Sequence, residues 1–132
     1  MQVDLVSPEK LLFSSEAISV EIPGSDGDMT AMANHAPLIT TLRPGILSVV
    51  QEKDTSEYVV TGGFAELGQG VSVLAEKAVL KADFDKKMFD ELVAVAEESL
   101  EAAKANMTGD AVDMAAKFLS DFNILGESLG FK

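Results

Sequence analysis

Residues 24–45 have the sequence GSDGDMTAMANHAPLITTLRPG, and this stretch decides how the first part of the chain folds. It contains three groups of turn residues: a glycine turn with Asp26 and Asp28, a second turn at His35, and a third at Arg43. Glycine, proline, asparagine and aspartate favour tight turns, and the short apolar runs between them are typical of β-strands. We therefore expect short strands joined by corners. Such corners hold polar residues at a surface where a partner can meet them.

The same pattern of short apolar runs and turn residues extends from residue 1 to residue 82. Val20 and Ile22, for example, alternate with Ser19 and Glu21, as in a half-buried strand. The expected strands cover residues 3–5, 11–14, 18–22, 29–33, 38–42, 45–51, 57–61, 64–67, 71–75 and 78–80. About ten closely spaced strands predict an antiparallel sandwich or barrel.

The composition changes at Asp83, because residues 83–132 lack proline and are rich in good helix formers. Asp83 is the expected N-cap of a first helix, with Asp85 in its first turn. The expected apolar stripe of that helix contains Met88, Leu92, Val95 or Ala96, Ser99 or Leu100, and Ala103. Residues 106–109 end it, and Thr108 or Asp110 caps a second helix. The stripe of the second helix is expected to contain Val112, Ala115, Ala116, Leu119 and Phe122.

The sequence thus predicts two domains: a β-domain over residues 1–82 and an antiparallel helical hairpin over residues 83–132. The hairpin core is expected to be narrow and made mainly of Ala, Met and Leu. Helices of this length gain most of their stability from packing on another element. We therefore expect the hairpin to be the mobile half of the protein.

The charge and composition exclude several classes of protein. The net charge of -12 argues against binding to nucleic acid or to anionic lipid, both of which select basic surfaces. The chain has no cysteine, so disulfides and thiolate metal sites are excluded. No stretch approaches the roughly 18 apolar residues that span a bilayer. The acidic N-terminus resembles neither a signal peptide nor a transit peptide, and we expect a soluble protein with no direct membrane insertion.

Enzyme motifs are missing as well. The single histidine, His35, provides no metal-binding pair and has no catalytic partner, and no nucleophile elbow or phosphate-binding loop is present. The Asp26–Asp28 turn is weakly similar to a calcium loop, but Pro37 lies where that loop needs a bidentate Glu. His35 itself has two interpretations: hydrogen bonding within its own turn, or contact with a partner. We expect no catalytic residue, no metal site and no cofactor.

Taken together, the turns resemble those of a known family, the epsilon subunits of bacterial F-type ATP synthases. The segments that carry the resemblance are 5–9, 13–14, 18–28, 35–38, 43–45 and 62–64. Their order and spacing are specific, although each segment alone is a weak signal. The resemblance covers the whole chain, from the strands to the helical hairpin. The resemblance implies a ten-stranded antiparallel β-sandwich followed by a two-helix hairpin. Since the chain begins at Met1 without a transit peptide, we expect a bacterial protein on the cytoplasmic face of the plasma membrane.

The resemblance also implies a function and a set of contacts. Members are non-catalytic central-stalk subunits of the rotor, which couple rotation of the c ring to the gamma subunit and the catalytic hexamer. Carried onto this sequence, Asp26 and Asp28 match the turn that meets the c ring. Ser7, His35 and Thr40 match positions that face gamma or lie near its junction with the ring.

The hairpin departs from better-known members. In some bacteria it reaches the catalytic hexamer and inhibits hydrolysis through a basic second helix, whereas residues 110–132 here contain two lysines and four acids. Some members bind ATP through a pattern that Asp85 and Lys87 match only in part, because Lys replaces Arg and Met88 replaces a small Ala. The resemblance therefore implies weak or no ATP binding and weak or no inhibition.

Two other classes of function fit the sequence. One is a free-standing sandwich that binds a small ligand or a peptide at its edge, with the helices as a lid. The other is an unrecognised enzyme. Stable co-purification with a gamma-like coiled-coil protein separates the rotor subunit from both.

Overall fold

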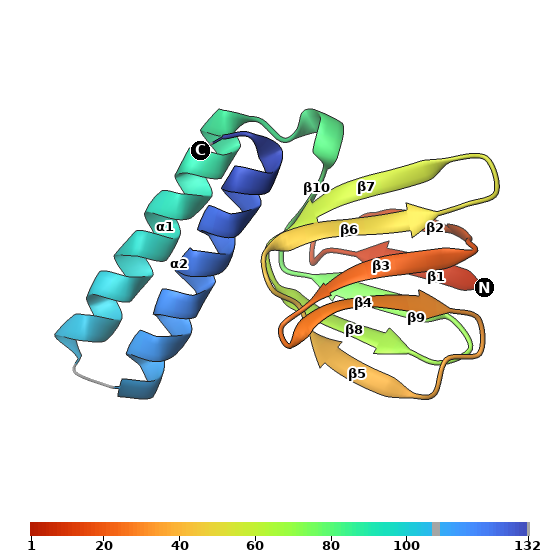
Figure 1. Ribbon diagram of the computed structural model, residues 1–132, viewed down its shortest axis with the longest axis horizontal. Coiled ribbons are helices and arrows are strands. Elements are labelled where there is room, and N and C mark those ends of the chain that lie inside the picture. The colour runs from red at the N-terminus through yellow and green to blue at the C-terminus, as the bar shows by residue number, and fades with distance from the viewer. Residues whose placement is uncertain (107–108, 132) are drawn as a thin grey trace. The chain divides into compact units, whose positions relative to one another are not determined.

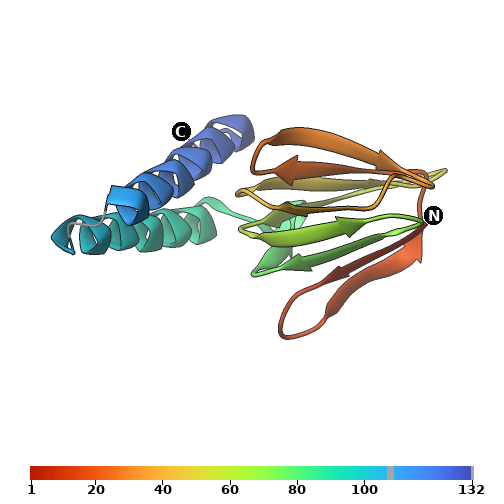
Figure 2. The same ribbon diagram turned by 90° about the horizontal axis from the view of Figure 1, so that it is seen from below.

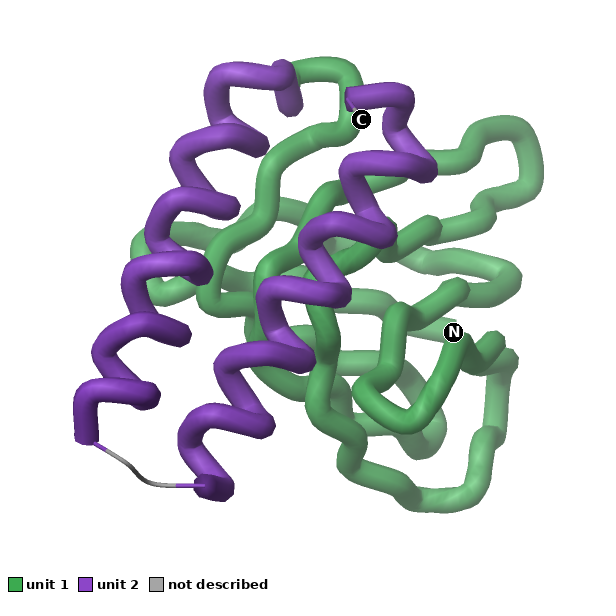
Figure 3. Tube along the Cα trace, turned by 60° about the vertical axis from the view of Figure 1, so that its left-hand side comes forward, with its two compact units in different colours: residues 1–83 green, residues 84–132 purple. Residues whose placement is uncertain are grey.

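The computed structural model describes residues 1–106 and 109–131 and shows ten strands, one short 3-10 helix and two α-helices over them (Figure 1). The chain divides into two compact units, Met1–Asp83 and Phe84–Lys132 (Figure 3). The first unit contains all the strands and the second both α-helices. The predicted fold, a β-sandwich followed by a helical hairpin, is confirmed.

Unit 1 is built from short strands joined mostly by tight turns. The elements are β1 (Gln2–Val6), β2 (Leu11–Glu16), β3 (Ser19–Gly24), β4 (Gly27–Met32), β5 (Leu38–Thr41), β6 (Gly45–Val50), β7 (Thr55–Val60), β8 (Gly63–Leu67), β9 (Val71–Ala75), β10 (Ala78–Leu80) and the 3-10 helix η1 (Lys81–Asp83).

The strands form two five-stranded sheets. Sheet A has the order β2-β1-β9-β8-β5, and sheet B has the order β10-β7-β6-β3-β4. All neighbouring strands are antiparallel except β1 and β9, which pair in parallel, with Val3 opposite Val71. The predicted antiparallel sandwich is confirmed, and β1 with β9 is the one parallel pair among the described strands. A parallel pair needs a long crossover, and the strands between β1 and β9 supply it.

The strands of unit 1 run lengthwise between two ends (Figures 1 and 2). One end, the Gly24 end, contains the β3–β4 turn, because Gly24 pairs with Gly27 there. The opposite end, the N-terminal end, contains Met1, whose backbone exchanges hydrogen bonds with Ala17. Ser19 pairs with Met32 near this end, so β4 runs from the Gly24 end to the N-terminal end.

The core lies between the two sheets and consists of aliphatic side chains. Val3, Val20, Leu47 and Val49 are completely buried. Alternation identified the inward face of β3 correctly from Val20 onward, but Ile18 precedes the strand and is 55% exposed.

Unit 2 is an antiparallel hairpin of α1 (Lys86–Ala105) and α2 (Gly109–Leu129) (Figure 1). The N-cap of α1 is Asp85, whose side chain accepts a hydrogen bond from the Met88 amide at 2.8 Å. The expected N-cap, Asp83, is wrong because that residue lies in η1. Asp110 lies in the first turn of α2 rather than at its cap, and Thr108 lies outside the described residues.

The hairpin core differs from the expected one. The buried face of α1 contains Phe89, Val93, Ala96 and Ala103. The expected Ala96 and Ala103 are confirmed, whereas Phe89 and Val93 are buried in place of the expected Met88 and Leu92, one position earlier. The bulky Phe89 is fully buried, and the face of α1 that carries it is the one packed in the hairpin core. Aromatic rings, rather than mainly Ala, Met and Leu, fill much of this core. The ring pairs are Phe84–Phe131, Phe89–Phe131 and Phe118–Phe122.

Candidate functional site

The acidic turn is a two-residue connection between β3 and β4. Ser25 and Asp26 form its tip, and Asp28 follows in β4. Gly27 has φ 135°, a backbone conformation that residues with a side chain rarely adopt. Glycine at this position lets the chain reverse within two residues. As a result, the two carboxylates lie at the Gly24 end on a short, sharply bent hairpin.

Arg43 holds both strands of this hairpin. Its Nη1 donates to the Gly24 carbonyl at 2.5 Å, and its Nη2 forms an ion pair with the Asp28 carboxylate. The planar guanidinium presents several donors in a fixed fork, so one side chain can bind a carbonyl and a carboxylate together. No local pattern in the sequence indicates this pairing, because 15 residues separate Arg43 from Asp28.

The backbone next to Arg43 is fixed to the same turn. The Arg43 amide donates to the Pro23 carbonyl, and the Ser25 amide donates to the Thr41 carbonyl, both at 2.9 Å. The Thr41 hydroxyl also donates to the Ser25 hydroxyl at 2.7 Å. A Cβ at Gly45 would lie 2.7 Å from the Pro23 side chain, so only glycine allows this close approach. The acidic turn is thus a well-anchored structure.

Ser7 and Thr40, two of the predicted gamma contacts, lie toward the Gly24 end. Ser7 closes the β1–β2 turn, and its amide donates to the Lys10 carbonyl at 2.9 Å. The Thr40 hydroxyl lies 3.5 Å from the position that a Cβ of Gly24 would take. These two residues therefore share one end of the sandwich with the acidic turn.

His35 lies at the other end of β4. It follows Asn34, whose φ of 61° is left-handed, and its Nδ1 donates to the Ala36 carbonyl at 2.7 Å. The hydrogen bond within its own turn, one of the two interpretations of this residue, is thus present. Because the length of β4 separates His35 from Asp28, the structure does not bring all the predicted contact residues together.

Asp85 and Lys87, the two candidate nucleotide residues, lie at the start of α1. The Asp85 carboxylate caps the helix through the Met88 amide. Lys87 is exposed in the first turn. Asp85 therefore has a structural role in this arrangement whether or not a nucleotide binds.

An exposed row of apolar side chains crosses sheet A near the Gly24 end. Phe64 pairs with Leu74, Leu74 with Val6, and Val6 with Leu11, so one line crosses four neighbouring strands. Leu11, Phe64 and Leu74 are 60%, 45% and 42% exposed. We call these four residues the apolar row. Phe64 and Leu74 are visible in the sequence as apolar residues of two expected strands, but their alignment with Val6 and Leu11 depends on the strand order.

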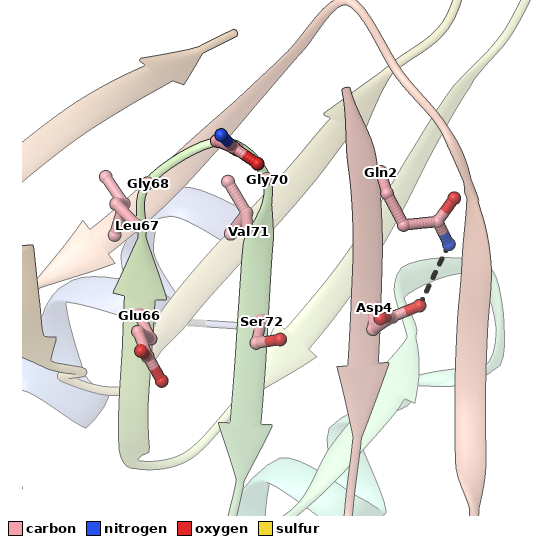
Figure 4. Close-up of a pocket in the computed structure, with 9 residues that line it drawn as sticks. Gln2, Asp4, Glu66, Leu67, Gly68, Gly70, Val71 and Ser72 are labelled. Atoms are coloured by element: carbon pink, nitrogen blue, oxygen red, sulfur yellow. Dashed lines mark hydrogen bonds between the residues drawn. The ribbon is translucent and has the colours of Figure 1, made fainter. Parts of the chain in front are cut away.

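A polar hollow of about 320 Å³ lies on the same sheet toward the N-terminal end (Figure 4). Asp4 accepts hydrogen bonds from Ser14 at 2.6 Å and from Gln2 at 3.0 Å. These bonds, that from Ser14 most strongly, lower the pKa of the Asp4 carboxyl from its ordinary value. The remaining lining residues are Glu66, Leu67, Gly68, Gln69, Gly70, Val71 and Ser72.

Residues 1–106 and 109–131 contain no group of three or more His, Cys, Asp or Glu side chains arranged to hold a metal ion. None of the described helices is both long and apolar enough to span a bilayer.

Comparisons with known proteins identify the family. Residues 1–81 match the family model of the β-sandwich domain of the ATP synthase delta/epsilon chain. The chain is 52% identical over 132 residues to the ATP synthase epsilon chain of Fuscovulum blasticum, covering 99% of this chain and 97% of the relative. It is 47% identical over 130 residues to that of Rhodobacter capsulatus, covering 98% and 96%.

Solved structures share the fold at low sequence identity. One is a chain of the Euglena gracilis mitochondrial ATP synthase, solved with OSCP, F1 and the c ring, at a TM-score of 0.70 and 22% identity, covering 96% of this chain and 79% of that one. Another is a chain of the Tetrahymena thermophila mitochondrial ATP synthase central stalk and c ring, at a TM-score of 0.53 and 14% identity, covering 67% and 68%. The sandwich and the sequence relatives lead to one conclusion: this chain belongs to the ATP synthase epsilon chain family, whose members are non-catalytic subunits of the complex.

Proposed function

We propose that the chain is a rotor subunit of the central stalk, which couples rotation of the c ring to gamma. The observation that carries the proposal is the combination of two neighbouring surfaces on one sandwich. The acidic turn projects at the Gly24 end, and the apolar row crosses sheet A close to that same end. A subunit that joins two different partners needs two such chemically distinct surfaces next to each other.

The apolar row is the proposed gamma contact. Three of its four side chains are exposed and that of Val6 is partly buried. The alternate residues on the same strands, Leu5, Ala65 and Val73, are buried in the core. Contiguous exposed apolar side chains are typical of protein interfaces. Ser7 and Thr40 lie toward the same end and are proposed to lie near the junction of gamma with the ring. His35, at the far end of β4, is proposed to contact gamma separately.

The acidic turn is the proposed c-ring contact, through Asp26 and Asp28. An acidic, well-anchored turn fits polar loops that carry basic or hydrogen-bond-donating groups. The structures of the Tetrahymena and Euglena complexes, each of which includes a chain with this fold, contain the c ring. On this proposal the protein is peripheral, on the cytoplasmic face of the bacterial plasma membrane.

The hairpin is proposed to inhibit hydrolysis weakly or not at all. Within the described part of α2, Lys117 is the single basic residue, and it pairs with Asp121 at 2.9 Å. This pairing leaves the helix acidic and poorly suited to an acidic catalytic surface. ATP binding at Asp85 and Lys87 is likewise proposed to be weak or absent, because lysine lacks the fork of arginine.

Substitution in the apolar row tests the gamma contact. We expect Leu74→Glu to reduce co-purification of the chain with gamma by at least tenfold, because a charge would be buried in the interface. Ile18→Glu, at an exposed apolar residue outside the row, is the matched control and should leave co-purification unchanged. Equal retention of both variants on gamma would contradict the proposal.

A further inference from the structure

We propose that Arg43 is the positioning residue of the acidic turn, and that Asp26, rather than Asp28, is the carboxylate that the turn presents to its partner. This inference rests on the proposed contact of the turn with the ring and assigns separate roles to the charged residues of the turn. Arg43 offsets the charge of Asp28 through an ion pair and holds the backbone, and Asp26 meets a cationic or hydrogen-bond-donating group of the partner.

The position of Arg43 supports its role as an anchor. Its side chain is 25% exposed, so the cation lies against the protein, and it pairs there with the Asp28 carboxylate, whose side chain is 81% exposed. The guanidinium binds the last residue of β3, Gly24, and the second residue of β4, Asp28. It therefore spans the base of the turn, and a lysine, with a single ammonium, could not hold both groups with the same geometry.

Backbone pairing places the guanidinium where it can do this. Residues 41–43 run alongside residues 23–25, through the bonds from Arg43 to Pro23 and from Ser25 to Thr41 and the bridge between Gly24 and Leu42. Because this segment follows β5 of sheet A while the turn belongs to sheet B, the contacts also join the two sheets at the Gly24 end. The orientation of the turn is thus fixed relative to sheet A.

Asp26 differs from Asp28 in its contacts. It lies at the tip of the turn and is exposed. In the described parts of the chain, its carboxylate takes part in no ion pair or hydrogen bond, whereas that of Asp28 is paired. Since the charges of Arg43 and Asp28 offset each other, the net negative charge of the turn is that of Asp26.

Two measurements on single variants test this division. The first is amide hydrogen exchange at Ser25, whose N–H donates to Thr41. The second is the pumping ratio, the amount of protons pumped per ATP hydrolysed. It is measured with each full-length variant assembled into the complex in membrane vesicles. The variants are Arg43→Lys, Asp28→Asn and Asp26→Asn. The control is Lys53→Met, at the opposite end of the sandwich.

We expect Arg43→Lys to raise exchange at Ser25 by about tenfold and to lower the pumping ratio. Asp28→Asn should raise exchange by a smaller factor, about threefold. Asp26→Asn should leave exchange unchanged and lower the pumping ratio about twofold or more. Lys53→Met should change neither quantity.

The failures of the two claims are distinguishable. Unchanged exchange at Ser25 in Arg43→Lys would overturn the positioning role, whatever the pumping ratio. A pumping ratio lowered by Asp28→Asn at unchanged exchange, but not by Asp26→Asn, would overturn the choice of Asp26. If neither aspartate variant alters pumping while the subunit stays bound, the ring contact itself, and with it that part of the proposed function, is wrong.

Discussion

The ring of Phe89 occupies the space that a side chain at Gly126 would need. A Cβ built at Gly126 would lie 2.3 Å from Cζ of Phe89, far inside van der Waals contact. Phe89 is fully buried, and Phe131 packs on it at a centroid distance of 5.6 Å. The Phe131 amide in turn donates to the Gly126 carbonyl at 2.8 Å. One glycine in α2 thus lets an aromatic cluster join the end of the chain to the start of α1.

Gly126→Ala is therefore expected to destabilise the hairpin. At an ordinary helix position this change stabilises by up to about 1 kcal/mol, since glycine is a poor helix former. Here the added methyl group would displace Phe89, and such overpacking costs about 1–3 kcal/mol. Hydrogen exchange of the α1 and α2 amides in the full chain measures the difference. Gly109→Ala, where a Cβ meets nothing within 4 Å, is the control and should not speed exchange. Slower exchange in Gly126→Ala would contradict this account of the packing.

Phe131→Ala should loosen the same end of the hairpin. Its ring packs on both Phe84 and Phe89, at centroid distances of 6.1 and 5.6 Å. Since the side chain is only half-buried, we expect a loss of about 1–3 kcal/mol in hairpin stability, below that of a full core truncation. Exchange should rise most in the first turns of α1. Ile124→Ala, at a residue 59% exposed, should change stability by less than about 0.5 kcal/mol. Equal effects of the two variants on hairpin stability would show that the aromatic cluster does not hold this end of the hairpin together.

The Asp4 carboxyl should make sandwich stability depend on pH. Its pKa lies below the ordinary value of 3.8, because Ser14 and Gln2 donate hydrogen bonds to the ionised form. A lowered pKa in the folded state adds stability above about pH 4, and this stability is lost as the pH falls through the folded-state pKa. Urea unfolding at pH 6 and at pH 3 gives the free energy of unfolding of the wild type and of Ser14→Ala. The difference between the two proteins should be smaller at pH 3 than at pH 6. A difference that widens on acidification would contradict the sign.

Removal of residues 84–132 should leave ATP hydrolysis by the complex almost unchanged. The sandwich has a core of its own, so the truncated chain is expected to fold and assemble. The acidic α2 is a poor match for an acidic catalytic surface, so little inhibition is present to be relieved. Steady-state ATPase activity of complexes with full-length and truncated chains checks this. A several-fold rise on truncation would show that the hairpin does inhibit.

The fold could be predicted from the sequence wherever local chemistry determined it. Turn residues and alternation located the strands: Val20 and Ile22, on either side of the exposed Glu21, both face the core. Helix composition and the lack of proline identified residues 83–132 as helical. These signals act over a few residues and need no knowledge of the strand order.

Features that depend on long-range pairing could not be predicted. The parallel pairing of β1 with β9 brings Val3 to Val71, and no local pattern encodes that neighbour. The ion pair of Arg43 with Asp28 depends on the register of residues 41–43 against the β3–β4 turn. The apolar row became visible only once the order of sheet A was known. In the hairpin, Phe89 is buried in place of the expected Met88, and its ring lies where a side chain at Gly126 would be.

The central claim, that the acidic turn of this sandwich meets the c ring, is tested most directly by site-specific cross-linking in the intact complex. The chain has no cysteine, so Asp26→Cys carries a unique thiol for a photoactivatable maleimide. Lys53→Cys, at the opposite end of the sandwich, is the matched control. We predict that illumination joins Asp26→Cys to the c subunit and leaves Lys53→Cys free of it. A c-subunit product from Lys53→Cys alone, or from neither position in a fully assembled complex, would contradict the account.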